Sequence, residues 1–271
     1  DLTVFVATTG ISILFGHSLG MHRRFIHESY KCPKWMEYFF VHLGTLMGIA
    51  GPIGMVKAHD LRDWAQRQPP GECHDYFGQQ QPFWTDAIWQ MHCQVQLAHP
   101  PLVVLEDRIA KDPVILWMEK YWMAQQIPWA IVMFSLGGWN WVVWGICARV
   151  SISVYGHFFV GWYAHNHGSI QDRNYHVEGA AIQGYNVRGW PYLGRKQFPM
   201  TLQAIMTAGE CYHNNHHAYP GSCNLGLQQR EFDIGFHLLR AFEKLGVVWD
   251  LKYPQDLPAR PELIPISQDK E

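Results

Sequence analysis

The residues with the clearest capacity for chemistry are histidines, which occur 16 times in 271 residues and gather in a few segments. These segments are HRRFIH (His22, His27), KAHD (His59), YAHNHG (His165, His167) and YHNNHH (His213, His216, His217). Imidazole nitrogens suit borderline metals such as iron, zinc or copper. A lone histidine is more often structural, but clusters of this kind predict a histidine-rich metal site.

The spacing within each cluster limits how its rings can meet. His213 and His216 stand three residues apart and His213 and His217 four, so one helix would present them on one face. His22 and His27 are five apart, which places them on neighbouring faces of a regular helix. That pair would serve either two metals or one site at a frayed helix end.

The remaining histidines have weaker claims to chemistry. We expect structural roles for the scattered ones, and His17, inside an apolar run, receives no role. His74 lies among apolar neighbours, so ligation by it is disfavoured. The scattered set is His42, His92, His99, His157, His176 and His237. The six cysteines form no C-x-x-C pair, so a zinc knuckle and a disulfide framework are both disfavoured.

Three apolar runs supply the roughly 20 residues that a membrane-spanning helix needs. They cover residues 2–21, about 117–136 after the helix-start signal KDP, and about 141–164. Only the turn GGWN separates the last two, so they form a predicted hairpin. Trp139, Trp141 and Trp144 around this turn fit an interfacial aromatic belt better than core packing.

A fourth apolar run, 38–56, contains four glycines and Pro52 and lies between the first histidine pair and His59. A complete crossing would separate these histidines by the bilayer. If they share a site, the run must instead lie in the interface or re-enter it. With that choice, every histidine cluster falls on one side of the membrane.

Composition agrees with a membrane enzyme, because charged residues make up 16% and aromatic residues 14% of the chain. The net charge of −2 gives no reason to expect nucleic acid as a partner. We therefore predict an all-α, integral membrane helical bundle with hairpin spans, an interfacial helix and a histidine-rich cytosolic cap. Residues 1–271 would form one domain, and because the apolar run starts directly after Asp1, an N-terminal span is expected to be missing.

At these residues the chain resembles the integral-membrane fatty acid desaturases of the acyl delta-9 type, which carry three histidine boxes. The match runs through GMHRRFIHESYKCPKW, LGGWNWVVWGICARV, GECYHNNHHAYP and FDIGFHLLRAFEKLGVVWDLK, and so covers nearly the whole chain. The resemblance implies a pair of irons that activate dioxygen to remove two hydrogens from an acyl chain of a fatty acid or lipid. It also implies an external electron donor of the ferredoxin or cytochrome b5 type.

Position by position, the resemblance assigns metal ligands to most of the clustered histidines. The first box gives His22 and His27, the third gives His213, His216 and His217, and His165 matches an isolated ligand, with His167 as second choice. The second box, H-x-x-H-H, falls on HDLRD. Here His59 matches, but Arg62 and Asp63 replace two imidazoles.

This departure leaves three interpretations open. Arg62 has no lone pair to give a metal, whereas Asp63 can bind through a carboxylate oxygen and follows His59 by one helical turn. The preferred interpretation is a remodelled two-metal site with Asp63 as a ligand, on a desaturase or an acyl-chain hydroxylase. The others are a single-metal oxidase and a desaturase-derived protein that only binds lipid.

Overall fold

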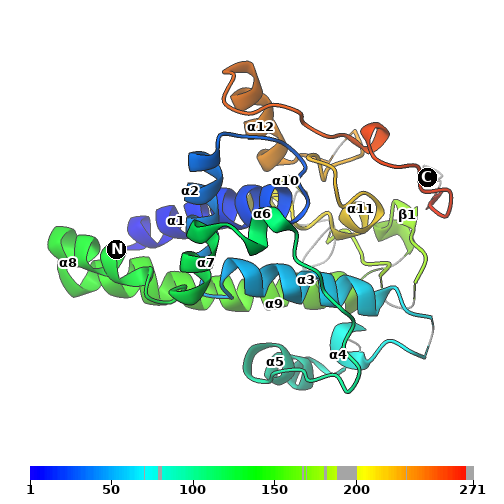
Figure 1. The fold of residues 1–271 in the computed structure, drawn as a ribbon, viewed down its shortest axis with the longest axis horizontal. Coiled ribbons are helices and arrows are strands. Elements are labelled where there is room, and N and C mark those ends of the chain that lie inside the picture. The colour runs from blue at the N-terminus through cyan, green and yellow to red at the C-terminus, as the bar shows by residue number, and fades with distance from the viewer. Residues whose placement is uncertain are drawn as a thin grey trace. The chain divides into compact units, whose positions relative to one another are not determined.

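The computed structural model shows a mainly helical chain (Figure 1). It describes residues 1–69, 71–78, 81–166, 168, 170–179, 182–187, 200–229 and 231–266. The one sheet among these residues is a short antiparallel pair of β1 (Tyr175–His176) and β2 (Ile264–Pro265). The all-α class is therefore confirmed at the level of a predominantly helical fold.

Two compact units divide the chain. Unit 1 comprises residues 1–28, 32–59 and 102–157, and unit 2 comprises residues 29–31, 60–101 and 158–271. Unit 1 contains the apolar N-terminal helix and residues 126–157 of the second long apolar stretch, and unit 2 contains the third histidine box. Each unit is described by itself below.

The first predicted span is one continuous helical path formed by α1 (Leu2–Ile11) and η1 (Ser12–Ile26). In η1 the backbone has the wider π-helical turn. At its end the His27 N–H donates to the carbonyl of His22, five residues back, at 3.1 Å. The helix runs five residues beyond the predicted end at residue 21. Its last turn carries His22, and His27 follows directly after it.

Glycines allow η1 to lie directly against α2 (Lys34–Thr45). A Cβ on Gly16 would come 2.4 Å from the backbone carbon of Leu43, and one on Gly44 would come 2.7 Å from the Gly16 carbonyl oxygen. No side chain fits at these distances, so the two backbones touch. This contact fixes the helix that carries His22 and His27 against the rest of unit 1.

The apolar run 38–56 does not form one helix. α2 ends at Thr45, and α3 (Pro52–Gln66) begins after a turn in which Gly48 has a φ of +76°. The carboxylate of Glu119 accepts hydrogen bonds from the backbone of Ile53 at 2.8 Å and Gly54 at 3.2 Å, which stabilises the new helix start. The run therefore breaks at its glycines, and its place relative to a membrane stays a prediction.

The predicted hairpin is confirmed. α8 (Gln126–Val142), η2 (Val143–Ala148) and α9 (Arg149–Asn166) form one helical path that turns at Gly138, where φ is 64° and ψ is −157°. Gly145 lies directly against the Met133 sulfur, and a regular helix would keep two residues so far apart in sequence well separated. The reversal falls within GGWN.

The predicted start of the hairpin's first arm is wrong. Trp117 belongs to a separate helix, α7 (Pro113–Lys120), which Asp112 caps by accepting from the N–H groups of Val114 and Ile115. The chain leaves helical geometry at Tyr121, with φ −115° and ψ 28°. The next helix begins only at Gln126. The apolar character of 117–136 is continuous, but the backbone is not.

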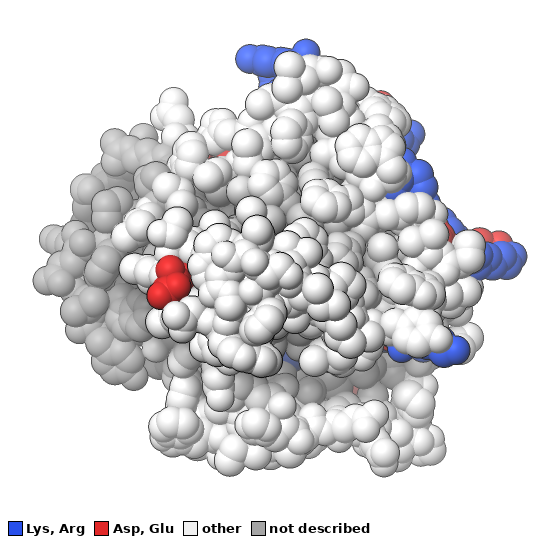
Figure 2. Space-filling view, turned by 90° about the vertical axis from the view of Figure 1, so that its left-hand side faces the viewer, with Lys and Arg blue, Asp and Glu red and all other residues white. Residues whose placement is uncertain are grey.

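Two helical stretches are long and apolar enough to cross a membrane, Leu2–Ile26 and Gln126–Asn166. Only 22% and 17% of their most apolar windows are buried, whereas the core helix of a soluble protein would be mostly buried. Large apolar side chains such as Ile131, Leu136 and Trp139 are exposed on them. On the side of the molecule drawn in Figure 2, few Lys, Arg, Asp or Glu side chains are visible.

Unit 2 is built from short elements joined by long loops. Its helices are α4 (Asp75–Gly78), α5 (Phe83–His92), α10 (Met200–Met206), α11 (His213–Ala218) and α12 (Ile234–Lys244), with single turns η3 (Ile170–Asp172) and η4 (Pro254–Asp256). The remaining short helix, α6 (Asp107–Ala110), belongs to unit 1. Small clusters replace one large core, for example Val177, Ile182 and Ala218 around the end of α11.

Candidate metal centre

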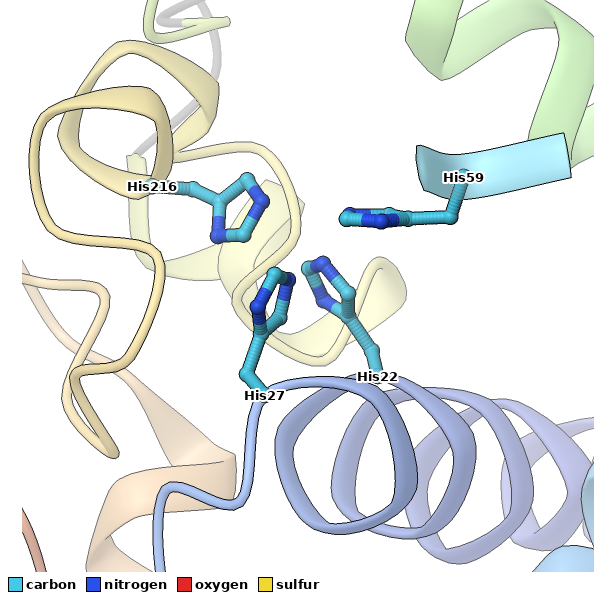
Figure 3. A group of neighbouring side chains, drawn as sticks. All are labelled: His22, His27, His59 and His216. Carbon is cyan, nitrogen blue, oxygen red and sulfur yellow. The ribbon is translucent and has the colours of Figure 1, made fainter. Parts of the chain in front are cut away.

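The first group of histidines lies in unit 1 and consists of His22 of η1, His27 directly after η1, and His59 of α3. One nitrogen from each ring falls within 4.8 Å of the others. The ring centroids of His22 and His27 are 4.8 Å apart, and those of His27 and His59 are 4.7 Å apart. Figure 3 shows these three rings turned toward a common space. We call this group the first trio.

The π-helical turn decides how the first box works. Five residues complete about one turn of such a helix, so His27 follows His22 along the same face. Of the two possibilities that the spacing left open, the structure therefore favours one shared site over two separate directions. His17, a further five residues back, stacks on His22 at 6.1 Å between ring centroids and contacts His157 at 5.2 Å.

The surroundings of His27 favour its neutral form. Burial, followed by the neighbouring His59 and His22, holds the pKa of His27 well below its ordinary value. A neutral imidazole keeps the lone pair that a metal needs. Rings that face one another, of which His22 is buried and His27 favours its neutral form, are therefore suited to hold a cation between them.

The second group lies in unit 2 and consists of His165, near the end of α9, with His213 and His217 of α11. The Nε2 atoms of His213 and His165 are 3.1 Å apart, and those of His217 and His213 are 2.9 Å apart. Two nitrogens bound at about 2.0–2.1 Å to one tetrahedral metal lie about 3.3 Å apart. We call this group the second trio.

Hydrogen bonds alone satisfy the second trio poorly. A ring nitrogen carries either one hydrogen or one lone pair, so the Nε2 of His213 can pair with only one of its two neighbours at a time. One metal ion would accept a lone pair from all three. The predicted alignment of His213 and His217 on one helix face is therefore realised in a geometry that suits a metal.

Asparagines hold α11 in place. The side-chain oxygen of Asn186 accepts from the backbone N–H groups of Asn214 and Asn215, at 3.1 and 3.3 Å, in the first turn of the helix. Asn215 in turn donates to Glu231 at 2.7 Å, and the Asn214 oxygen accepts the Asn174 N–H at 2.8 Å. The two residues between the histidines of the third box therefore fix the helix that carries them.

Gly184 packs against the second trio. A Cβ at this position would lie 3.0 Å from the Cδ2 atoms of both His213 and His217, and its φ is +59°. The next residue, Tyr185, donates its N–H to the carbonyl of Ala164 at 2.7 Å, beside His165. The backbone at Gly184 thus forms one wall of the second trio.

His216 also belongs to α11 and is buried. Its ring centroid lies 5.6 Å from that of His217 and 6.3 Å from that of His213. Its nitrogens are not among those that approach one another in the second trio, and Figure 3 draws its side chain. Its assignment as a ligand stays a prediction.

The degenerate second box has other partners in the structure. Arg62 is half-buried and donates to the side-chain oxygen of Gln90 on α5 at 2.5 Å. Burial lowers its pKa, but a guanidinium still offers no lone pair to a metal. Asp63 forms an ion pair with Arg67, with 3.0 Å between Oδ2 and Nε, so its assignment as a ligand stays a prediction.

The remaining candidates contribute no ligand in the described part of the chain. The Nδ1 of His74 accepts the Tyr76 N–H at 3.1 Å. His42 pairs with Gln125 at 2.6 Å and accepts from Trp129 at 2.9 Å, which fits a structural role. His167, the second choice at its cluster, lies outside the described residues. Reasoning from the sequence missed Asn186 and Gly184, which act on the second trio from loops.

A buried carboxylate beside Arg62 predicts a pH-dependent stability. Asp86 is completely buried, and burial raises its pKa from 3.8 to about 6, against the smaller attraction of Arg62. Above pH 6 the folded state carries an ionised carboxylate at a cost that is absent when the group is protonated. The Asp86→Asn variant is therefore expected to be more stable at pH 7.5, by roughly 1–3 kcal/mol.

This gain should shrink as the pH falls from 7.5 to 5, because the wild-type carboxyl then takes up its proton in the folded state. Thermal unfolding of wild type and Asp86→Asn across this pH range measures the difference in stability. Each kcal/mol should shift the Tm by roughly 2–4 °C. A lower Tm for Asp86→Asn at pH 7.5 would mean that the groups that stabilise the carboxylate, namely Gln81, Trp162 and Arg62, outweigh the burial.

Comparison with known proteins identifies the scaffold. The chain is 30% identical over 254 residues to the sn-1 stearoyl-lipid 9-desaturase of Anabaena variabilis, covering 91% of this chain and 84% of that protein. It is 30% identical over 253 residues to the protein of the same name from Synechocystis, covering 93% and 71%. The Delta-9 acyl-lipid desaturase 1 of Arabidopsis thaliana is 22% identical over 246 residues, covering 90% and 73%.

No family model matches the chain. The relatives nevertheless align over most of its length. Their names all describe desaturation of an acyl lipid. The chain belongs to the fatty acid desaturase family.

Proposed function

We propose that this protein is a membrane-bound, iron-dependent oxidoreductase that uses dioxygen to place a double bond in the acyl chain of a fatty acid or lipid. The observation that carries the proposal is the pair of histidine trios in a member of the desaturase family. The two apolar helical stretches support a multi-pass membrane protein, and we place the histidines on the cytosolic side.

The residues present fit iron. Each trio offers three imidazole nitrogens at close range, and the lowered pKa of His27 keeps its ring neutral. The proposed ligands are His22, His27, His59, Asp63, His165, His213, His216 and His217. When bound, two iron ions would supply the redox chemistry that activates dioxygen and removes hydrogen from an unactivated carbon.

The protein's own task is to hold and shield this centre. Burial of His22, His165 and His217 keeps bulk water away, which limits side reactions. The π-turn orients His22 and His27, and Asn186 orients α11. The rigid supports set the ligand geometry before any substrate arrives.

The reaction needs an external reductant. Formation of a double bond releases two protons and two electrons, whereas reduction of dioxygen to two waters takes four electrons and four protons, of which solvent supplies the other two protons. A donor must therefore supply two further electrons. We propose a partner of the ferredoxin or cytochrome b5 type as this donor.

Hydroxylation of the acyl chain is the second candidate activity. The observation that favours it is the second box, which differs from the family's H-x-x-H-H. Arg62 donates a hydrogen bond to Gln90, and Asp63 offers a carboxylate oxygen in place of an imidazole nitrogen. A different donor set can change the outcome after the first hydrogen is removed. A lipid-binding protein without catalysis is the third candidate.

Expression in a host that lacks unsaturated lipids separates these candidates. The fatty acids are profiled by mass spectrometry, with His213→Ala as the inactive variant and the exposed His176→Ala as its matched control. New monounsaturated chains with wild type and His176→Ala, but not with His213→Ala, support desaturation. Hydroxylated chains support the second candidate, and unchanged lipids refute both activities.

Asp63 gives a specific prediction about the second box. Although its carboxylate pairs with Arg67, both side chains are partly exposed, and such a pair contributes less than about 1 kcal/mol. The carboxylate is thus free to exchange this partner for a metal. Asp63→Asn is expected to lower iron affinity about tenfold or more, whereas Arg67→Met leaves it unchanged.

Iron titration of the purified proteins, followed by elemental analysis, measures this difference. If both variants bind iron as wild type does, Asp63 serves only its ion pair and its proposed role as a ligand is wrong.

A further inference from the structure

A buried glutamine lies beside the second trio in unit 2. Gln66, the last residue of α3, is only 1% exposed, although its side chain is polar. Its Nε2 lies 3.4 Å from the Nε2 of His165, the same atom that faces His213 at 3.1 Å. An amide group therefore borders the nitrogens that form the second trio.

The orientation of this amide is fixed. The Nε2 of Gln66 donates to the backbone carbonyl of Phe77 on α4 at 2.6 Å, so the nitrogen cannot exchange places with the side-chain oxygen without losing this bond. An amide nitrogen has two hydrogens and no lone pair to give. One hydrogen serves Phe77, and the second is available on the side of His165.

Gln66 consequently cannot be a metal ligand in this orientation, but it can donate. When a metal takes the lone pair of His165, the second N–H needs another acceptor, because a buried donor without one costs about 1–3 kcal/mol. A metal held by three imidazoles keeps an open position for a ligand from solution. That ligand is the acceptor within reach.

We propose that Gln66 is a positioning residue that donates a hydrogen bond to the water or small anion completing the coordination of a metal held by His165, His213 and His217. The proposal rests on the proposed metal site. It assigns to Gln66 control over which small ligand enters and how it is oriented. The second box has Arg62 and Asp63 in place of two imidazoles. The helix that carries it, α3, still places a polar side chain, Gln66, beside the second trio.

The test uses the full-length protein loaded with Co²⁺, whose visible absorption reports on its ligands, and azide as the probe anion. The part of the cobalt spectrum that disappears in His213→Ala defines the second trio. Azide is then titrated into wild type, Gln66→Leu and Gln66→Met. Gln90→Leu is the matched control, because Gln90 donates to the neighbouring carbonyl of Tyr76 at 2.7 Å and contacts none of the three histidines.

Both Gln66 variants are expected to keep their cobalt and to bind azide about tenfold more weakly, as the loss of one hydrogen bond to an anion requires. Gln90→Leu should bind azide as wild type does, even if its Tm falls. Unchanged azide affinity in the Gln66 variants would overturn the proposal. Loss of cobalt from them would overturn it too, because Gln66 would then be a ligand.

The experiment distinguishes failure of the metal site from failure of the role of Gln66. If wild type binds no cobalt that His213→Ala removes, the metal site itself is refuted, whatever the Gln66 variants do. If wild type binds cobalt there and only the azide result is negative, the metal site stands and the role of Gln66 falls.

Discussion

Replacing His213 by alanine is expected to abolish metal binding at the second trio. Its Nε2 lies between those of His165 and His217, at 3.1 and 2.9 Å, so the variant loses the central nitrogen of the three. Removal of groups that merely support a ligand already weakens metal binding about 10–100-fold, and loss of a ligand should exceed this. Desaturation should fall below detection while the protein still folds.

Elemental analysis and fatty acid profiles of the same preparations measure both effects. His176→Ala is the control, because this exposed histidine of β1 belongs to neither trio. Retention of full metal content by His213→Ala would contradict the assignment of the second trio. An equal loss in both variants would instead indicate general damage to unit 2.

Replacing Gly184 by valine should have a similar effect without touching a ligand. The new Cβ would lie 3.0 Å from the Cδ2 atoms of both His213 and His217, which is closer than carbon atoms pack. Its branches would displace at least one ring. We therefore expect most of the metal at the second trio to be lost, and with it the activity.

Gly246→Val separates the steric effect from backbone strain. Gly246 also has a positive φ, +70°, but a Cβ there meets nothing within 4 Å. Both substitutions should cost about 1–2 kcal/mol of stability for the left-handed backbone, yet only the one at Gly184 should reduce bound metal. If the two variants lose metal equally, the wall that we assign to Gly184 does not matter to the site.

Local patterns in the sequence predicted the features that depend on neighbouring residues. The helix start at KDP, the turn at GGWN and the shared face of His213 and His217 each depend on a few adjacent positions, and each is present. The end of α7 at Lys120 was missed because the apolar run continues through it. The break depends on the turn at Tyr121, which hydropathy does not reveal.

The relative direction of His22 and His27 could not be predicted from the sequence, because it depends on the π-helical geometry of η1. A five-residue spacing suits a π-turn, but nothing in HRRFIH distinguishes such a turn from a regular helix. The spacing therefore left two arrangements open. Packing of Gly16 and Gly44 fixes η1 in place, and this contact joins residues that are far apart in sequence.

The residues that support the second trio could not be predicted from local sequence patterns either. Asn186, Gly184 and Gln66 reach the histidines from other segments, and none of them stands in a recognisable motif with its target. The asparagines of HNNHH were visible, but their function depends on Asn174 and Glu231. The candidate metal ligands can thus be identified within one segment of the sequence. The residues that orient these ligands can be identified only from the folded structure.

Iron content is the most direct test of the central claim, which is that the two histidine trios hold the catalytic metal. The purified protein is loaded with Fe²⁺ without oxygen, freed of excess metal and analysed for iron per chain. The account predicts about two iron ions for wild type and a clear loss in both His22→Ala and His213→Ala. Wild type without iron, or variants with as much iron as wild type, would contradict it.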